Sequence, residues 1–465
     1  MIKKHFMKLA VEELEKEELA TSVMENGIQS DSDECEEHPD FTAVTKAEDD
    51  IDEHLDYISE VVCDVGDVEA IAEFTEETAT QGGADAVTAE ILQIGSESLY
   101  ERLGVRPAKV VLSVENFGSK LSKQEGTKLA IEGFKEFIKN MWEAIKAAFK
   151  KMSNYLTHYV KMVFNLNTFT IRAANSLNDN MKKTPITAQN KALLAGTALS
   201  VKVSGYMFSL SMPENENSFG DLNKDLQKST LVFAKSAKII NNFTNYLSSN
   251  QDLKDLIKDE ESFSAIKYPD LSEGFQKVKS DVWSQAVHGI DDTKNYFKSE
   301  NMIGSRAIYI TEPGDSKTKV GREAIKAIEE TSIKLAGTIN VKSSFKEEAG
   351  FYQIDAMNPM AFSEIIKTII FVCDKISGSE KGYLDLVLKH DEMINEIDAV
   401  EKMLTQSEED YAEYKTRVAA IRTFSNSVNR LTGELIKAVS GSLTKACHTS
   451  TVYVNQSYKA YLRHQ

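Results

Sequence analysis

Several residue types that mark particular classes of protein are scarce in this sequence. Of its 465 residues only 4 are cysteine and 7 are proline. Cysteines without a CxxC pair exclude a disulfide-stapled scaffold and favour free thiols in a reducing compartment. So few prolines exclude collagen-like and low-complexity chains. The best apolar run, 365–373, falls well short of the roughly 18 residues of a membrane-spanning helix. These absences predict a globular protein made in a cytoplasm.

Motifs that carry catalysis or hold metal ions are missing as well. None of the 8 histidines lies in an HExxH or HxH arrangement. Asp31 and Asp33 have the spacing of a calcium loop, but Glu36 stands where that loop needs glycine. The stretch 314–321 contains the letters of a phosphate-binding loop in the wrong order and is more typical of a turn. We therefore predict no catalytic residue, no cofactor, no metal site and no enzyme activity.

Negative charge is concentrated in the first quarter of the chain. Residues 1–115 hold 30 acidic and 8 basic side chains, a net charge of −22, whereas the other 350 residues hold 42 acidic and 46 basic ones, a net charge of +4. The total of −18 argues against nucleic-acid binding by the whole chain, because phosphate contacts need lysine and arginine. The segment 116–465 taken alone is mildly positive, so its charge does not disfavour contact with nucleic acid.

The acidic segment 1–115, which we call the leader, has little capacity to fold by itself. Between 30 and 56 the chain is too polar and too negative to collapse. A short helical section is plausible at 68–102, where apolar residues are sparse and a Gly-Gly pair interrupts the pattern. We predict a weakly ordered N-terminal segment.

The clearest helical pattern follows the leader. From 129 to 163 apolar residues recur at steps of three and four, a spacing typical of one helix face. The segment 116–165 carries 9 lysines and 4 glutamates, a net charge of +5, so we predict a basic amphipathic helix there. Its predicted apolar face contains Phe134, Phe137, Met141, Trp142, Ile145 and Phe149.

Two interpretations of this apolar face stay open. Such a stripe is usually the buried side of a helix in a bundle. Because lysines flank it, the same face could instead lie on an anionic membrane or dock on a partner. Lysine contacts with nucleic-acid phosphates are a further option, but the aromatic residues lie away from the lysines, which disfavours base stacking.

The remaining segment, 166–465, predicts a helical body. An apolar stripe from 411 to 439 indicates a long helix, and the apolar residues of 384–404 indicate its antiparallel partner. Three prolines are typical of the start of a new helix or segment. They follow Thr184, Tyr268 and Asn358.

Strand-like patterns occur at three places, 306–311, 338–341 and 350–354. They predict a β-hairpin or three-stranded insertion near 305–355. The predicted fold class is therefore mainly α, a helical bundle body with a small β insertion and a weakly ordered acidic N-terminal segment.

The short motif Ser113-Val114-Glu115 lies where the acidic leader ends and the net charge of the chain becomes positive. Small and flexible residues follow it, and such residues can enter a protease cleft in an extended form. The pattern S-x-E is weak by itself, since it also occurs at 32–34 and 407–409. Its position at the end of the leader makes it a candidate cleavage site, with an ordinary interdomain linker as the alternative. The candidate site consists of Ser113, Val114, Glu115 and Asn116.

An acidic leader ending in S-x-E, a lysine-rich aromatic helix and a mainly helical body together resemble the internal head proteins of large contractile-tailed bacteriophages. The resemblance implies packaging in the prohead and removal of the leader by a prohead protease, which cuts after a glutamate two residues beyond a small or apolar residue. Ser113 would then be the specificity residue and Glu115 the residue before the cut. The implied partners are other head or scaffold proteins, the prohead protease and, after maturation, packaged DNA. The implied location is the interior of the virion head.

We therefore expect a structural protein of the phage head that is proteolytically matured by cleavage after Glu115. The alternative is a membrane-active protein, delivered with the genome or secreted, whose 129–163 helix inserts at a bilayer surface. Membrane contact is the less favoured of the two.

Overall fold

The computed structural model describes most of the C-terminal three quarters of the chain. The described residues are 123–186, 199–204, 222–249, 253–278, 293–337, 351–404 and 411–463, with Lys46 and Phe74. Helices make up 73% of this described part, and its strands form small antiparallel sheets. The prediction of a mainly α chain is therefore confirmed.

Two compact units make up the chain. The first comprises Met1–Glu34 and Tyr57–Phe149, and the second comprises Cys35–Asp56 and Lys150–Gln465. The helices and sheets described here belong to the second unit, except that its first long helix begins within the first unit.

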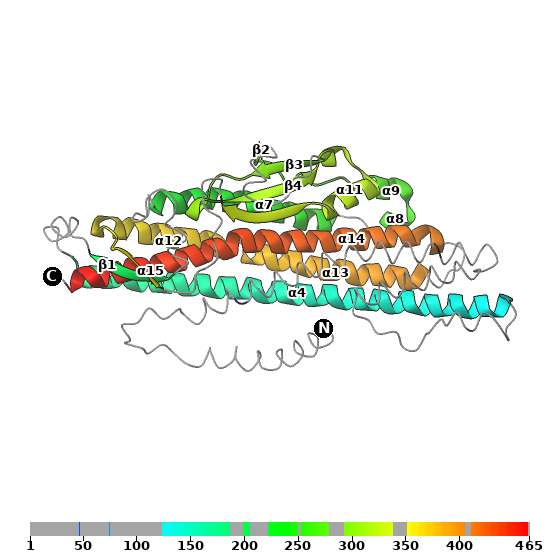
Figure 1. Cartoon of the computed structure of the whole chain (residues 1–465), viewed down its shortest axis with the longest axis horizontal. Helices are drawn as coiled ribbons and strands as arrows, with labels where there is room; N and C mark the ends of the chain where they lie inside the picture. Colours follow the sequence, from blue (N-terminus) through cyan, green and yellow to red (C-terminus); the bar gives the residue numbers. More distant parts are fainter. Residues whose placement is uncertain are drawn as a thin grey trace. The chain divides into compact units, whose positions relative to one another are not determined.

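Long helices dominate the second unit (Figure 1). They are α4 (Lys123–Lys183), α7 (Leu222–Ser249), α12 (Phe362–Ser377), α13 (Glu380–Leu404), α14 (Tyr411–Ile436) and α15 (Ser442–Leu462). Three short helices are α8 (Leu253–Lys258), α9 (Glu260–Ser264) and α11 (Gly321–Glu329). A π-helical segment, η5 (Lys437–Gly441), joins α14 to α15, so these two helices follow one another without a turn.

Local sequence explains where two of these helices begin and end. Helix α4 runs beyond the predicted 116–165 segment and stops just before Pro185, because a residue preceding proline is disfavoured in the α conformation. Helix α12 follows a 3₁₀ turn, η4 (Pro359–Ala361), at which the Asn358 side chain accepts a hydrogen bond from the Met360 amide at 3.0 Å. Asparagine before proline thus acts as the predicted start signal.

Side-chain contacts give the relative direction of α13 and α14. His390 Nε2 lies 3.2 Å from Asn426 Oδ1, and Arg422 donates to Asp398 at 2.9 Å. Residue numbers rise along α13 while they fall along α14, so the two helices are antiparallel. The sequence predicts this pairing from its two apolar stripes.

Helix α4 runs parallel to α14 and α15. Asn429 donates to Ser153 at 3.4 Å, and Thr170 Oγ1 lies 3.4 Å from His448 Nδ1. Near the end of α4, the Tyr458 hydroxyl donates to the Asn180 carbonyl at 3.2 Å. Both sets of residue numbers rise together, and the contacts extend along α4 from Ser153 to Asn180.

The combined helix α14–η5–α15 occupies the centre of these contacts. Between 417 and 451, only Thr423, Glu434 and Lys437 are other than buried. Helices buried on all sides are normally apolar, yet this one contains many serines and threonines. Several of their hydroxyls donate to carbonyls four residues earlier, as Thr432 does to Val428 at 2.8 Å and Ser450 to Ala446 at 2.6 Å. These bonds remove much of the cost of burying the hydroxyl groups.

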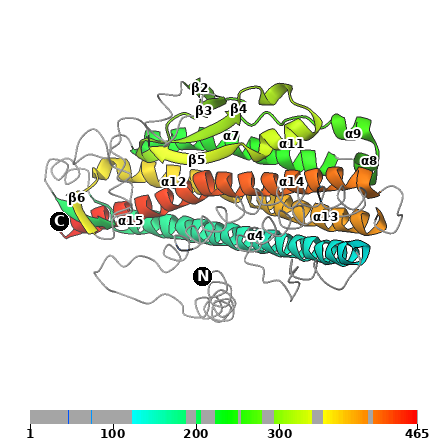
Figure 2. The same ribbon diagram turned by 45° about the vertical axis from the view of Figure 1, so that its right-hand side comes forward.

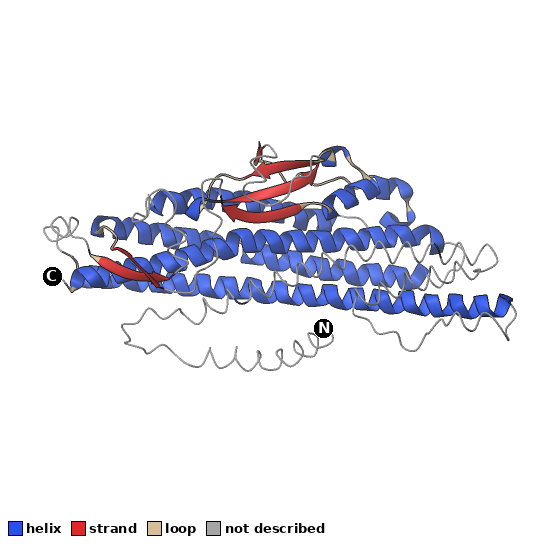
Figure 3. Ribbon diagram, in the orientation of Figure 1, coloured by secondary structure: helices blue, strands red, loops and turns tan. Residues whose placement is uncertain are grey.

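The strands form two separate antiparallel sheets (Figure 3). The four-stranded sheet has the order β2 (Gln276–Val278), β3 (Lys294–Lys298), β4 (Arg306–Pro313) and β5 (Ser332–Gly337). The two-stranded sheet pairs β1 (Ser200–Ser204) with β6 (Phe351–Asp355). The larger sheet lies against α11 and α14, and β1 lies against α15.

The predicted β insertion near 305–355 needs correction. The strand predicted at 306–311 lies within β4, but the strand at 350–354 corresponds to β6 and pairs with β1 rather than with β4. The strand predicted at 338–341 lies outside the described residues. Strands of three to five residues are too short for alternation to identify them, and pairing between distant segments leaves no local pattern.

Candidate functional site

The predicted cleavage site and apolar face fall largely outside the described side chains. Ser113, Val114, Glu115 and Asn116 lie outside the described residues. Phe134, Phe137, Met141, Trp142, Ile145 and Phe149 belong to the backbone of α4, but their side chains are outside the described set. Both assignments therefore stay predictions.

The continuation of the same apolar stripe is described, and it is buried. Leu156, Tyr159, Val160 and Val163 are 0% exposed. In this part of α4 the stripe packs in the core of the second unit, which favours the bundle interpretation over insertion in a bilayer. No helix in the described part of the chain is long and apolar enough to cross a membrane.

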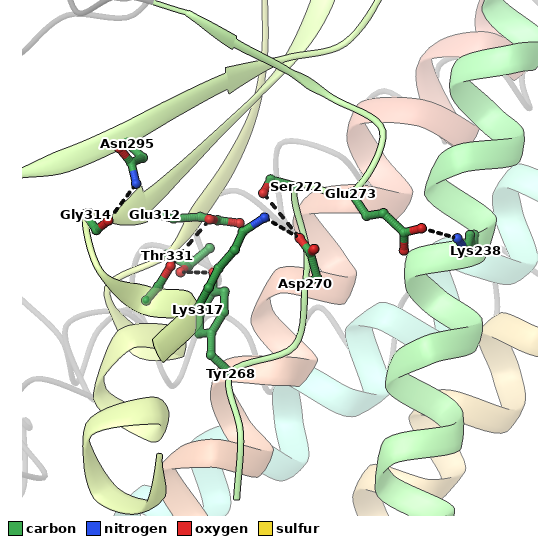
Figure 4. Close-up of polar contacts among 11 residues, drawn as sticks. Lys238, Tyr268, Asp270, Ser272, Glu273, Asn295, Glu312, Gly314, Lys317 and Thr331 are labelled. Carbon is green, nitrogen blue, oxygen red and sulfur yellow. Dashed lines mark hydrogen bonds and ion pairs between the residues drawn. The ribbon is translucent and has the colours of Figure 1, made fainter. Parts of the chain in front are cut away.

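A group of polar side chains surrounds a buried carboxylate at the end of β4 (Figure 4). Glu312 is 0% exposed, although it precedes the turn that leaves the sheet. Three segments provide its neighbours, the chain after α9, the 3₁₀ turn η3 (Ser316–Thr318) and the residue before β5. We call the following set the Glu312 cluster: Tyr268, Asp270, Ser272, Glu312, Ser316, Lys317 and Thr331.

Hydrogen bonds and one ion pair connect these segments. The Tyr268 hydroxyl lies 2.9 Å from Thr331 Oγ1, and Lys317 Nζ lies 3.0 Å from Asp270 Oδ1. Ser316 donates to Glu312 Oε2 at 3.5 Å, whereas Glu312 Oε1 has no hydrogen-bond partner in the described part of the structure. The cluster therefore joins three segments around a buried carboxylate, and only one oxygen of this carboxylate accepts a hydrogen bond within the described structure.

Gly314 shapes the turn beside the cluster. Its amide donates to the Thr293 carbonyl at 2.9 Å, and its carbonyl accepts from Asn295 Nδ2 at 2.8 Å. A Cβ atom on this residue would lie 2.9 Å from the Thr293 carbonyl oxygen, closer than real Cβ atoms come. The stretch 314–321 thus forms a turn followed by α11, as the sequence predicts, and not a phosphate loop.

Burial changes the acidity of the cluster. Burial raises the pKa of Glu312 above its usual value, although the Ser272 hydroxyl and the Lys317 ammonium act in the opposite direction. Burial is also the main cause of the raised pKa of the Tyr268 hydroxyl. The folded protein therefore binds a proton at Glu312 more tightly than the unfolded chain does.

Replacement of Glu312 by glutamine is expected to stabilise the protein at neutral pH. Because the pKa of Glu312 is raised on folding, its contribution to stability is fully present below the unfolded value of 4.5 and is lost as the pH rises through the folded pKa. Removing a poorly paired buried charge should increase the free energy of unfolding by about 1–2 kcal/mol at pH 7.5 and by less at pH 4.5. Urea unfolding at the two pH values measures this difference. Glu323→Gln, on the exposed side of α11, is the control and should change neither value.

A second polar group joins α14 to the sheet. Arg430 donates to the carbonyls of Glu329 at 3.0 Å and Thr331 at 2.8 Å, and to Glu434 Oε1 at 2.6 Å. The other carboxylate oxygen of Glu434 accepts from the Ile333 amide at 2.8 Å. We call this set the Arg430 joint, because one ion pair on α14 holds the end of α11 and the start of β5.

Sequence reasoning misses both groups. Arg430 and Glu434 are four residues apart on a helix with an apolar stripe, and this spacing was the one available signal for the joint. Glu312 carries no local signal, since its burial depends on segments up to 44 residues away. In the part of the chain that the structure describes, no group of three or more histidine, cysteine or acidic side chains could hold a metal ion. The arrangement connects secondary-structure elements.

Comparisons with known proteins identify the family. A family model described as phiKZ-like phage internal head proteins matches residues 34–449. No curated protein and no solved structure matches this chain. The family match covers most of the chain and agrees with the resemblance derived from the leader and the basic helix. An internal head protein lies in the virion interior and associates with other components of the head. The chain belongs to the family of phiKZ-like phage internal head proteins.

Proposed function

We propose that this chain is a structural, non-catalytic component of the phage head, packaged in the prohead and cut by the prohead protease after Glu115. The observation that carries the proposal is the family match over 34–449, which extends to both sides of the proposed cut. The S-x-E motif and the change of charge at the same position support it. The proposed organisation is a leader (1–115), a basic amphipathic helix (116–165) and a helical body (166–465).

Removal of the leader would reverse the charge of the protein. The precursor carries a net charge of −18, and the residues after Glu115 carry +4. Before cleavage, the leader would shield the basic helix and bind basic surfaces of other head or scaffold proteins. After cleavage, the mildly positive product would tolerate packaged DNA as a neighbour. The proposed order of events is assembly first, cleavage second and DNA contact last.

The helical body is proposed to act as a rigid bundle within the head. Contacts between α4 and α13 and α14 support this, since Ser153 Oγ lies 3.1 Å from His390 Nδ1 and accepts from Asn429. Both Ser153 and His390 are buried, so the polar contacts hold the helices in one register. A packed bundle of this kind suits a structural component of the head.

Mass spectrometry of the protein recovered from mature heads tests the processing step. We expect an N-terminus at Asn116 for the natural chain. Glu115→Gln removes the carboxylate of the residue before the cut, and essentially all of this variant should retain Met1. Glu409→Gln, in another S-x-E sequence, is the matched control and should be processed normally.

Two results would contradict the proposed processing. An intact Met1 in mature heads would support the interdomain linker, and cleavage of the Glu115→Gln variant at the same bond would exclude recognition of Glu115. Deletion of 1–115 tests the shielding role separately, because incorporation into heads should then fall. Unchanged incorporation would mean that the leader has no such role.

A further inference from the structure

The outward side of α4 is rich in positive charge. Within the second unit α4 lies at the edge of the helical layers, on the side away from the four-stranded sheet (Figures 1 and 2). One line of residues, spaced by three or four positions along the helix, is exposed from Lys150 to Lys183. It includes Asn154, Lys161, Asn165 and Arg172. We call this exposed line of residues the α4 face.

Acidic residues are almost absent from this part of the helix. From 144 to 183 the sequence contains 7 basic residues and 1 acidic residue, Asp179. Asp179 is already paired with Lys182 at 3.0 Å. By contrast α13 contains 7 acidic and 3 basic residues. Positive charge is therefore a property of the α4 face and is not shared by the neighbouring helix.

The cations on the α4 face recur at a constant interval. Lys150, Lys161, Arg172 and Lys183 are each 11 residues apart, and all four are exposed. Eleven residues make slightly more than three helical turns, so the four side chains share one side of the helix and are spaced by about 16.5 Å. In the sequence of the same helix, Lys128 and Lys139 continue the interval.

This interval matches the backbone of a DNA duplex. One turn of B-DNA rises by about 34 Å. Each of the two strands crosses a line parallel to the axis once per turn. A protein lying along that line therefore meets a negatively charged backbone about every 17 Å on average, half of one turn. We propose that the α4 face lies along duplex DNA and that Lys150, Lys161, Arg172 and Lys183 contact successive phosphate backbones.

The residues between the cations fit the same partner. Amide side chains such as Asn154 and Asn165 donate hydrogen bonds to phosphate oxygens, and such contacts carry no base sequence information. The proposed binding is therefore independent of DNA sequence and depends on salt. The proposal rests on the location of the protein inside the DNA-filled head and names the surface that faces the DNA.

The acidic leader is the competing occupant of this face. Its charges are irregularly placed in the sequence, for example between 30 and 56, and do not repeat at the interval of the cations. A duplex supplies backbone crossings that repeat regularly along its whole length, separated alternately by the major and the minor groove. The regular interval therefore favours DNA.

The test measures binding to two 40-base-pair duplexes of unrelated sequence by fluorescence anisotropy over a range of salt concentrations. The protein carries whichever N-terminus is found in mature heads, so the result does not depend on the proposed cleavage. The test variant is Lys150→Gln/Lys161→Gln/Arg172→Gln/Lys183→Gln. The control variant removes four exposed lysines elsewhere: Lys277→Gln/Lys326→Gln/Lys367→Gln/Lys381→Gln. All eight side chains are exposed, so both variants are expected to fold. Thermal unfolding verifies this.

We expect the natural chain to bind both duplexes equally. The α4 variant should bind about 100-fold to 1,000-fold more weakly at about 0.1 M salt, and its slope of log K against log salt should be smaller by about 3 to 4. The control variant should lose much less affinity and keep most of the slope. Equal losses in the two variants would show a general charge effect and overturn the proposal, as would the absence of DNA binding in the natural chain. Unchanged DNA binding by the α4 variant, with faster proteolysis of 1–115 in the full chain, would assign the face to the leader instead.

Discussion

Replacement of Arg430 by methionine is expected to lower the free energy of unfolding by about 3 kcal/mol, because it leaves the partly buried carboxylate of Glu434 without its ion-pair partner. Burial already raises the pKa of Glu434 despite the neighbouring guanidinium, so loss of that guanidinium would further disfavour the charged carboxylate. The carbonyls of Glu329 and Thr331 lose a donor in addition. Urea unfolding followed by circular dichroism measures the change.

The double variant Arg430→Met/Glu434→Gln separates the charge from the packing. Glutamine keeps an oxygen that can accept from the Ile333 amide, and it removes the unpaired charge. We expect the double variant to recover about half of the lost stability. A double variant as unstable as Arg430→Met would show that the ion pair is not the cause. The joint matters for the architecture because it holds the sheet to the central helix.

Replacement of Tyr383 by alanine is the second change with a large expected effect. Tyr383 is 2% exposed, its ring centre lies 6.1 Å from that of Phe164, and its hydroxyl lies 2.9 Å from Ser440 Oγ. It therefore connects α13 with α4 and with the π-helical segment. Removal of a buried aromatic ring should cost about 3–5 kcal/mol, since the surrounding helices cannot close the cavity.

Tyr383→Phe is the matched control for this experiment. It keeps the ring and removes only the hydrogen bond to Ser440, so about 1 kcal/mol should be lost. The same urea unfolding assay measures both variants. Equal losses in the two would mean that the hydroxyl, and not the packing of the ring, holds the three elements together.

These predictions locate stability and function in different parts of the chain. The Arg430 joint and Tyr383 lie among buried elements and are expected to affect unfolding. The α4 face and the residues around Glu115 are expected to affect DNA contact and maturation while leaving the fold intact. Under the proposed function, the protein would change its partners on cleavage without changing its core.

Much of the helical architecture could be predicted from periodicity. The stripe from 411 to 439 and its partner at 384–404 correspond to α14 and α13, and Asn358 before Pro359 marks the start of the segment that contains α12. These predictions succeed because a helix face and a helix start are encoded by residues close together in the sequence. The cleavage site and the apolar face at 134–149 stay predictions.

The division of charge at 115, the largely helical character and the lack of a catalytic or metal-binding motif can be predicted without the structure. The pairing of β6 with β1, the contacts of Arg430 with α11 and β5, and the burial of Glu312 become visible only in the folded chain. The physical reason is the distance along the chain. Charge and periodicity are sums over neighbours, whereas strand pairing, burial and ion pairs depend on which distant segments the completed fold brings into contact.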